Sequence, residues 1–144
     1  MPILRLLTLS VCAFSLACGS GDKGRESDDR DDDEKASAAV NLDPSSITAS
    51  EIALGDSIFH GLIGATSCQA CHGPKGKSGA AAPDLTDTTW LHSDGSFPAI
   101  YKQIETGVMA PKQFSSMMPP FGGAPLTPEK HRAVAAYVYK LSHP

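Results

Sequence analysis

The stretch Cys68-Gln69-Ala70-Cys71-His72 decides how this chain of 144 residues is interpreted. It places two thiols three positions apart and an imidazole directly after the second thiol. A zinc site would need a second ligand pair, which the remaining histidines do not supply at zinc spacing. A thioredoxin-like redox pair would need a βαβ context, which the sequence lacks. A plain disulfide between the two cysteines would leave a loop-rich domain without a core.

The same stretch matches the attachment signature of a c-type haem, and its spacing has a physical cause. Two thiols at the start of a short helical turn both reach the vinyl groups of one porphyrin, where they form thioethers. The following imidazole then points at the iron. We therefore predict one covalent haem c, attached through Cys68 and Cys71, with His72 as an iron ligand.

A helix is predicted on the N-terminal side of this stretch, over about residues 48–60. Thr48 and Glu51 have the form of a capping box, in which the two side chains satisfy each other's backbone N–H groups. Apolar residues follow at helical spacing, and Gly61 offers a stop.

Two further helices are predicted on the C-terminal side. Residues 97–106 follow Ser96 as N-cap and end at a glycine. Residues 128–142 follow Thr127 as N-cap, with Pro128 at the first helical position and apolar residues recurring at i, i+3, i+4 and i+7. Long Gly- and Pro-rich segments separate the helices, without an alternating run that would form a sheet. The predicted fold class is therefore all-α with long loops.

The first 17 residues read as an export signal. Arg5 supplies one positive charge, and a short apolar run that ends in small residues follows it. The run is too short to span a bilayer with stable flanks. Ser15-Leu16-Ala17-Cys18 then resembles the lipobox of bacterial lipoproteins, with Cys18 as the lipidated first residue. A conventional signal-peptidase cut nearby is the alternative, and in either case Cys12 is removed.

Residues 18–47 are predicted to be a disordered acidic tether. They contain the charged run from Asp28 to Lys35 and show no apolar periodicity. Such a segment cannot bury enough surface to offset the entropy of ordering. The net charge of −4 and a pI near 5.6 also exclude nucleic acid as a partner, since phosphate binding needs a basic surface.

Residues 48–144 resemble a class I cytochrome c, especially the short bacterial single-haem domains of cbb3-oxidase subunits and of quinoprotein-dehydrogenase partners, here in a lipoprotein form. The haem motif is highly specific, and the other matching residues support it together. They are Leu54-Gly55, Phe59, Gly73, Ala82-Pro83-Asp84-Leu85-Thr86, Trp90, Gly107, Met118-Pro119-Pro120-Phe121-Gly122-Gly123 and Ala135-Ala136-Tyr137-Val138.

The resemblance implies three or four short helices around one haem, with the N-terminal helix crossing the C-terminal one. Gly55 would allow their close approach. Phe59 would meet the helix face that carries Tyr137 and Leu141. These residues are expected to hold the scaffold and to carry no chemistry.

The resemblance also implies a methionine as sixth iron ligand, in the loop before the last helix. A thioether on iron raises the reduction potential relative to a second imidazole. Met118 matches the position of the family's ligand, and the prolines that follow it stiffen the loop. Met117, one residue off, and the more distant Met109 are the alternatives.

Pro83 resembles the family proline whose carbonyl accepts the other ring N–H of the iron-bound histidine, and ending a loop is its alternative role. Trp90 matches an aromatic residue near a haem propionate and is otherwise a core residue. Bis-histidine ligation by His92 or His131 is the less favoured alternative, and both are expected to be surface histidines. His60 is expected at a helix end.

The predicted function is that of a single-haem electron carrier, not an enzyme, because His72 and a methionine fill both axial positions. Its partners would be redox proteins such as a dehydrogenase or a terminal oxidase. Its place would be the periplasm or the outer face of the inner membrane, held there by the lipid anchor. The alternatives are a haem module stably docked to a dehydrogenase or oxidase, and a gas-binding haem sensor.

Overall fold

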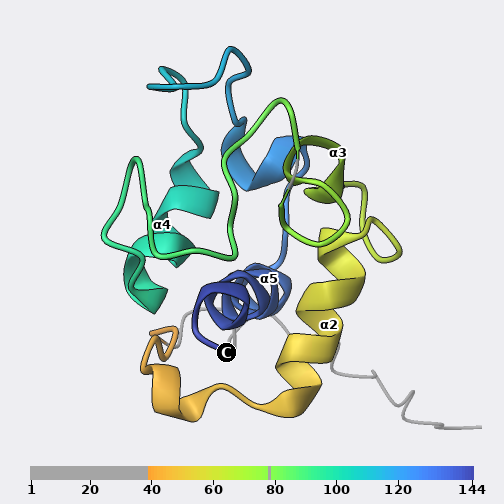
Figure 1. The fold of residues 1–144 in the computed structure, drawn as a ribbon. Coiled ribbons are helices and arrows are strands. Elements are labelled where there is room, and N and C mark those ends of the chain that lie inside the picture. The colour runs from red at the N-terminus through yellow and green to blue at the C-terminus, as the bar shows by residue number, and fades with distance from the viewer. Residues whose placement is uncertain (1–38, 78) are drawn as a thin grey trace, which may run out of the picture.

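The computed structural model describes residues 39–77 and 79–144, and helices make up the regular structure of this part of the chain (Figure 1). Over those ranges no strand occurs, and an isolated antiparallel bridge joins Val108 to Met118. The predicted all-α fold class is therefore confirmed. The predicted signal peptide and Cys18 lie outside the described residues. In chain order the elements are η2 (Pro44–Ser46), α2 (Ala49–Phe59), α3 (Gln69–His72), α4 (Phe97–Thr106), η3 (Pro120–Gly123) and α5 (Pro128–Ser142).

The capping box predicted for the first helix is present at the start of α2. The Glu51 backbone N–H donates to the Thr48 hydroxyl at 3.3 Å, and the Thr48 backbone N–H donates to the Glu51 carboxylate at 3.0 Å. The helix ends at Phe59, and Gly61 then adopts a left-handed φ of 72°. Residues 48–60 are thus organised as the sequence predicts.

The bounds of α4 and α5 agree with the predicted ranges, but their caps differ. Thr127 accepts a hydrogen bond from the Lys130 N–H at 3.4 Å, as a capping residue does. Ser96 makes no capping bond, and its hydroxyl donates to the Asp94 carboxylate at 2.7 Å. Pro98 in the first turn of α4 has no N–H, so this end presents fewer donors that need a cap.

The closest helix contact is the crossing of α2 over α5. A Cβ atom at Gly55 would lie 2.1 Å from the carbonyl oxygen of Ala133, so only glycine lets the two backbones meet here. Next to the crossing, the rings of Phe59 and Tyr137 pack with centroids 5.2 Å apart. Leu141, one turn further along α5, lies against Gly76. The predicted crossing is confirmed.

The core lies around α5, which packs against both α2 and α4 (Figure 1). Small residues on α5 let the neighbouring helices approach, and larger side chains from α2 and α4 fill the space between them. The buried apolar residues are Ile58, Phe59, Leu85, Phe97, Ile100, Ile104, Ala133, Val134, Ala135, Ala136 and Val138.

The last residues of the predicted tether, before residue 48, pack on the domain. Leu42 and Ile47 contact the core, and Asp43 caps the short η2 turn. Arg132 of α5 donates to the carbonyl of Asn41 at 2.6 Å and forms an ion pair with Glu51. The two apolar side chains and this arginine contact outweigh the polar composition of the segment. Residues 18–38 of the predicted tether lie outside the described residues.

Among residues 39–77 and 79–144, no helix combines the length and apolar character needed to cross a membrane.

The crossing at Gly55 gives a first prediction. Gly55→Ala should destabilise the folded protein by about 2 kcal/mol, because the added methyl group must push α2 away from α5. Helix propensity alone would favour alanine by about 1 kcal/mol. The sign of the change in unfolding free energy therefore shows whether contact between the helices or helix propensity dominates. Thermal unfolding of the haem-loaded protein measures the effect.

The matched control is Ala53→Gly, at an exposed position on the same helix. It should cost only the propensity term of about 1 kcal/mol. A Gly55→Ala protein as stable as the wild type would mean that the two helices do not need this close approach.

Candidate haem site

The short helix α3 positions the two thiols and the imidazole of the motif. Cys68 stands at its N-terminal end, and the His72 N–H donates to the Cys68 carbonyl at 3.0 Å. The side-chain amide of Gln69 donates to the His60 carbonyl at 2.6 Å and so ties α3 to the end of α2. Gly73 ends the helix with φ of 82° and lies so close to the Lys77 carbonyl that a Cβ atom would not fit. The motif is thus held from both ends.

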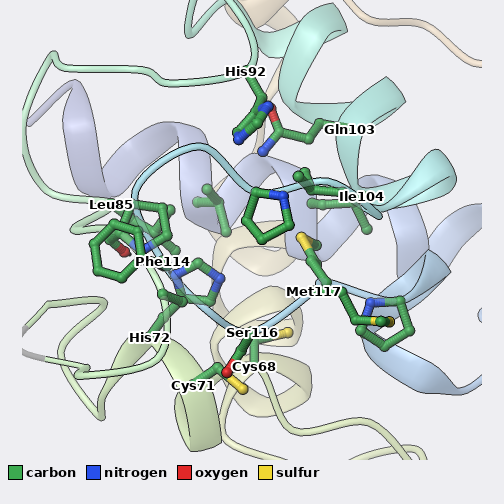
Figure 2. A pocket seen from close by; sticks show the side chains of 18 of the residues that line it. Cys68, Cys71, His72, Leu85, His92, Gln103, Ile104, Phe114, Ser116 and Met117 are labelled. Carbon is green, nitrogen blue, oxygen red and sulfur yellow. Dashed lines mark hydrogen bonds between the residues drawn. The ribbon is translucent and has the colours of Figure 1, made fainter.

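Above α3 lies a pocket with mainly apolar walls, drawn from close by in Figure 2. Its wall is assembled from α2, α3, α4, α5 and the two long loops between them. Lining residues include Phe59, Cys68, Cys71, His72, Pro83, Leu85, Trp90, His92, Ile100, Gln103, Ile104, Phe114, Met117, Met118, Phe121, Val134 and Val138. The three residues of the motif therefore open onto one space, as the haem hypothesis requires.

His72 is buried and fixed in one tautomer by Pro83. Its Nδ1 lies 2.9 Å from the Pro83 carbonyl oxygen, which can only accept, so Nδ1 carries the proton and donates. Nε2 is then left with a free lone pair. Burial lowers the pKa of His72, against the opposing effect of this hydrogen bond, so the ring is neutral at pH 7. A neutral ring with a free Nε2 is the form that binds a metal.

The two cysteines of the motif are free thiols in different surroundings. Cys68 is half-buried, and desolvation raises its pKa to about 11. Cys71 is exposed. Figure 2 shows both side chains below the pocket, next to His72. Both sulfurs are available to a group that fills the pocket.

Two of the three candidate methionines reach the pocket. Met118 is half-buried and packs against the core, and its backbone pairs with Val108 through N···O contacts of 2.8 and 2.9 Å. Met117 also lines the pocket, on the side across from His72 in Figure 2, although it is 57% exposed. Met109 is 62% exposed and lies outside the lining. Met118 and Met117 are thus the two ligand candidates that the geometry brings to the site.

Trp90 lies in the pocket wall, half-buried, and packs against the core. Gly95 approaches the indole ring so closely that a Cβ atom there would lie 2.3 Å from Nε1. Gly95 also has a left-handed φ of 79°, which favours glycine at this turn. The loop after Trp90 is therefore shaped around the indole.

The surface placement predicted for His131 is wrong. His131 is only 3% exposed, stacks on Tyr101 at 3.6 Å between ring centroids and contacts its carbonyl oxygen through Nε2 at 2.9 Å. His131 does not line the pocket. His92 is half-buried and lines the pocket, beside Gln103 in Figure 2. His60 stands at the end of α2, as predicted.

Gln103 is a pocket residue that the sequence interpretation missed. Its Oε1 is buried without a hydrogen-bond partner, which is costly unless a bound group or an ordered water supplies a donor. The helical spacing could have predicted that Gln103 faces the interior. It stands three residues after Ile100 and one before Ile104, on the apolar stripe of α4. This unmatched acceptor indicates that the pocket is built for an occupant.

The donor set fits haem iron and does not fit a bare metal ion. Among residues 39–77 and 79–144 no group of three or more His, Cys, Asp or Glu side chains is arranged so that it could hold a metal ion. One imidazole and one thioether on an apolar pocket suit an iron that brings four nitrogen ligands of its own. Two thiols in the same wall suit its covalent attachment.

Comparison with known proteins agrees with this geometry. Residues 55–138 match the family described as cytochrome C oxidase, cbb3-type, subunit III. The chain is 35% identical over 91 residues to the cbb3-type cytochrome c oxidase subunit CcoP of Rubrivivax gelatinosus, covering 63% of this chain and 26% of that protein. It is 36% identical over 94 residues to subunit FixP of Sinorhizobium medicae (strain WSM419), covering 63% and 30%.

A third relative is subunit FixP of Rhizobium meliloti (strain 1021), 42% identical over 79 residues, with 53% of this chain and 27% of that protein covered. The chain thus spans about a quarter to a third of the length of the curated relatives it matches. No solved structure gives a significant match. The family match covers more than half of the chain and includes the motif, the pocket and the point where α2 crosses α5. This protein therefore belongs to the cbb3-type cytochrome c oxidase subunit III family and is a class I c-type cytochrome.

Proposed function

We propose that this protein is a single-haem electron carrier. The observation that carries the proposal is the arrangement around His72: a neutral imidazole held by the Pro83 carbonyl, two thiols beside it and a methionine loop on the same apolar pocket. Cys68 and Cys71 would hold the haem through thioethers, and His72 Nε2 and Met118 would bind its iron. When bound, the haem supplies reversible one-electron chemistry at its iron.

Several residues of the pocket wall have roles that follow from their positions. Pro83 fixes the ring plane of His72 and increases its basicity as a ligand. Phe59, Val134 and Val138 present apolar surface to the pocket and exclude water. A dry, low-dielectric wall would disfavour the extra positive charge of an oxidised haem, so these side chains would raise its reduction potential. Methionine ligation acts in the same direction.

The partner that we propose is a terminal oxidase of the cbb3 type, because the matching relatives are subunits of such oxidases. This chain corresponds to only part of each relative, so it would act as a separate carrier or as a haem module docked to the complex. A dehydrogenase on the donor side would complete the path. The near-neutral domain lacks the net charge for long-range steering, so the contact would be local and short-lived.

We also propose that the protein is exported and anchored through lipid on Cys18. The apolar N-terminal run followed by a small-residue stretch and cysteine supports this proposal. The acidic segment between Cys18 and the domain would serve as a tether. The domain would then reach partners near the membrane surface.

The sixth ligand can be tested by removing each methionine in turn. Met118→Ala should abolish the weak near-infrared sulfur-to-iron band of the ferric protein, lower the reduction potential and let the ferrous protein bind carbon monoxide. Met117→Ala and Met109→Ala should leave all three properties nearly unchanged. Absorption spectra and redox titration of the haem-loaded proteins measure them.

Two outcomes would contradict this assignment. Loss of the band in Met117→Ala alone would place the ligand one residue earlier. Carbon monoxide binding by the unaltered ferrous protein would show an open axial position and favour a gas sensor over a carrier.

The lipid anchor can be tested at the mature N-terminus. Mass spectrometry of protein purified from membranes should find an N-terminal Cys18 that carries diacylglycerol, and Cys18→Ser should release the protein from the membrane fraction. An unmodified N-terminus downstream of Cys18 would instead indicate ordinary secretion.

A further inference from the structure

The loop that carries Met118 is held at two places, and the second was not evident from the sequence. The first is the backbone pairing of Met118 with Val108, which joins the loop to the end of α4. The second is Thr66, which is only 3% exposed. Its hydroxyl oxygen lies 3.1 Å from the carbonyl oxygen of Phe121 and 3.1 Å from that of Gly122. Thr66 thus contacts the η3 turn, which begins at the second of the two prolines after the methionine.

The backbone of η3 is shaped to receive this hydroxyl. Gly122 has a left-handed φ of 71°, and a Cβ atom there would lie 2.5 Å from the Thr66 hydroxyl oxygen. Phe121 also has a positive φ, 54°, which is unfavourable for a residue with a bulky side chain. Backbone in such a conformation persists only when its surroundings hold it. Two carbonyls turned toward one buried donor are part of that support.

The side chain of Phe121 is fixed from the other direction. Its ring meets His131 edge to face, with centroids 5.1 Å apart, and His131 in turn stacks on Tyr101. The ring of Phe121 is therefore fixed by α4 and α5, while its carbonyl faces Thr66. The turn can move away from the pocket only if the contact to Thr66 breaks.

Thr66 also belongs to the segment that leads into the attachment motif, two residues before Cys68. Figure 1 shows the blue η3 turn next to α3, where the two segments meet. One hydroxyl thus joins the side of the pocket that carries Cys68 and His72 to the side that carries the methionine. The intervening Pro119 and Pro120 have restricted φ angles, so a displacement at Phe121 is transmitted to Met118.

We propose that Thr66 is a positioning residue for the sixth ligand. Its hydroxyl donates to the carbonyls of the η3 turn and thereby holds Met118 at the pocket. This inference rests on the proposed function, in which Met118 binds the haem iron. It assigns to Thr66 a role in ligand retention beyond general stability. Loss of the hydroxyl should therefore make the methionine easier to displace.

The test is Thr66→Val, which keeps the shape of the side chain and removes the donor. The haem-loaded ferric protein is titrated with imidazole, which binds only where the methionine has left. Thr66→Val should bind imidazole roughly tenfold more tightly than the wild type, the size expected when a buried hydrogen bond is lost and its acceptors stay unpaired. Thr66→Ser, which retains the hydroxyl, should stay within about twofold of the wild type.

The matched control is Thr106→Val. The Thr106 hydroxyl also donates to a backbone carbonyl, that of Lys102 at 3.0 Å, but on the exposed surface of α4. Its removal should leave the imidazole affinity unchanged. Thermal unfolding of every variant separates ligand retention from general stability, because a purely structural role would lower the unfolding temperature without changing the imidazole affinity.

The outcomes distinguish the two levels of the proposal. A wild-type protein without the sulfur-to-iron band would overturn the methionine ligation on which the inference rests. If that band is present and Thr66→Val binds imidazole no more tightly than the wild type, the positioning role of Thr66 is disproved. It is also disproved if Thr66→Ser loosens the methionine as much as Thr66→Val does. Should Thr66→Val fail to mature with haem, Thr66→Ala compared with Thr66→Ser decides by the same criterion.

Discussion

The rest of the structure depends on the backbone contact between α2 and α5 at Gly55. Because no side chain separates the helices there, the carbonyl of Ala133 faces the α2 backbone directly. This close crossing brings Phe59 of α2 and Val134 and Val138 of α5 to the same pocket. Each such side chain contributes about 1.5–3 kcal/mol when it is buried, so the crossing organises both the stability of the domain and the shape of its cavity.

Around this pair of helices, long loops must be kept in place by a few specific bonds. The Pro83 carbonyl orients His72, the Val108 pairing holds Met118, and the Thr66 hydroxyl contacts the turn that follows it. All three bonds border the apolar pocket. A large, flat, apolar group in that pocket would complete the core, which explains how a domain with so many loops stays folded.

The helices could be predicted because their ends are encoded locally. Thr48 with Glu51, and Thr127 with Pro128, are capping signals that act within one turn, and the observed bounds follow them. The haem motif could be predicted for the same reason, because its three functional side chains lie within five residues. Gly55 and Phe59 followed from the family resemblance, which supplied the partner helix.

The surface prediction failed for His131, because burial there depends on distant segments. His131 stands between charged neighbours in the first turn of α5, and only the fold reveals that Tyr101 and Phe121 cover it. The polar composition of residues 18–47 gives no indication that Leu42 contacts the core. Thr66 carries no sequence signal for its role, because its acceptors lie 55 and 56 residues away. Sequence patterns therefore locate the motif, and tertiary contacts determine what holds it.

The central claim is that the thiols of Cys68 and Cys71 hold one haem in this pocket, and intact mass spectrometry of the denatured protein after maturation in an exporting host tests it most directly. The account predicts the mass of the mature chain plus one haem, retained after acid acetone. Replacement of both Cys68 and Cys71 by alanine should abolish the added mass. A wild-type chain that loses its haem in acid acetone would contradict covalent attachment, and a second haem would contradict the single site.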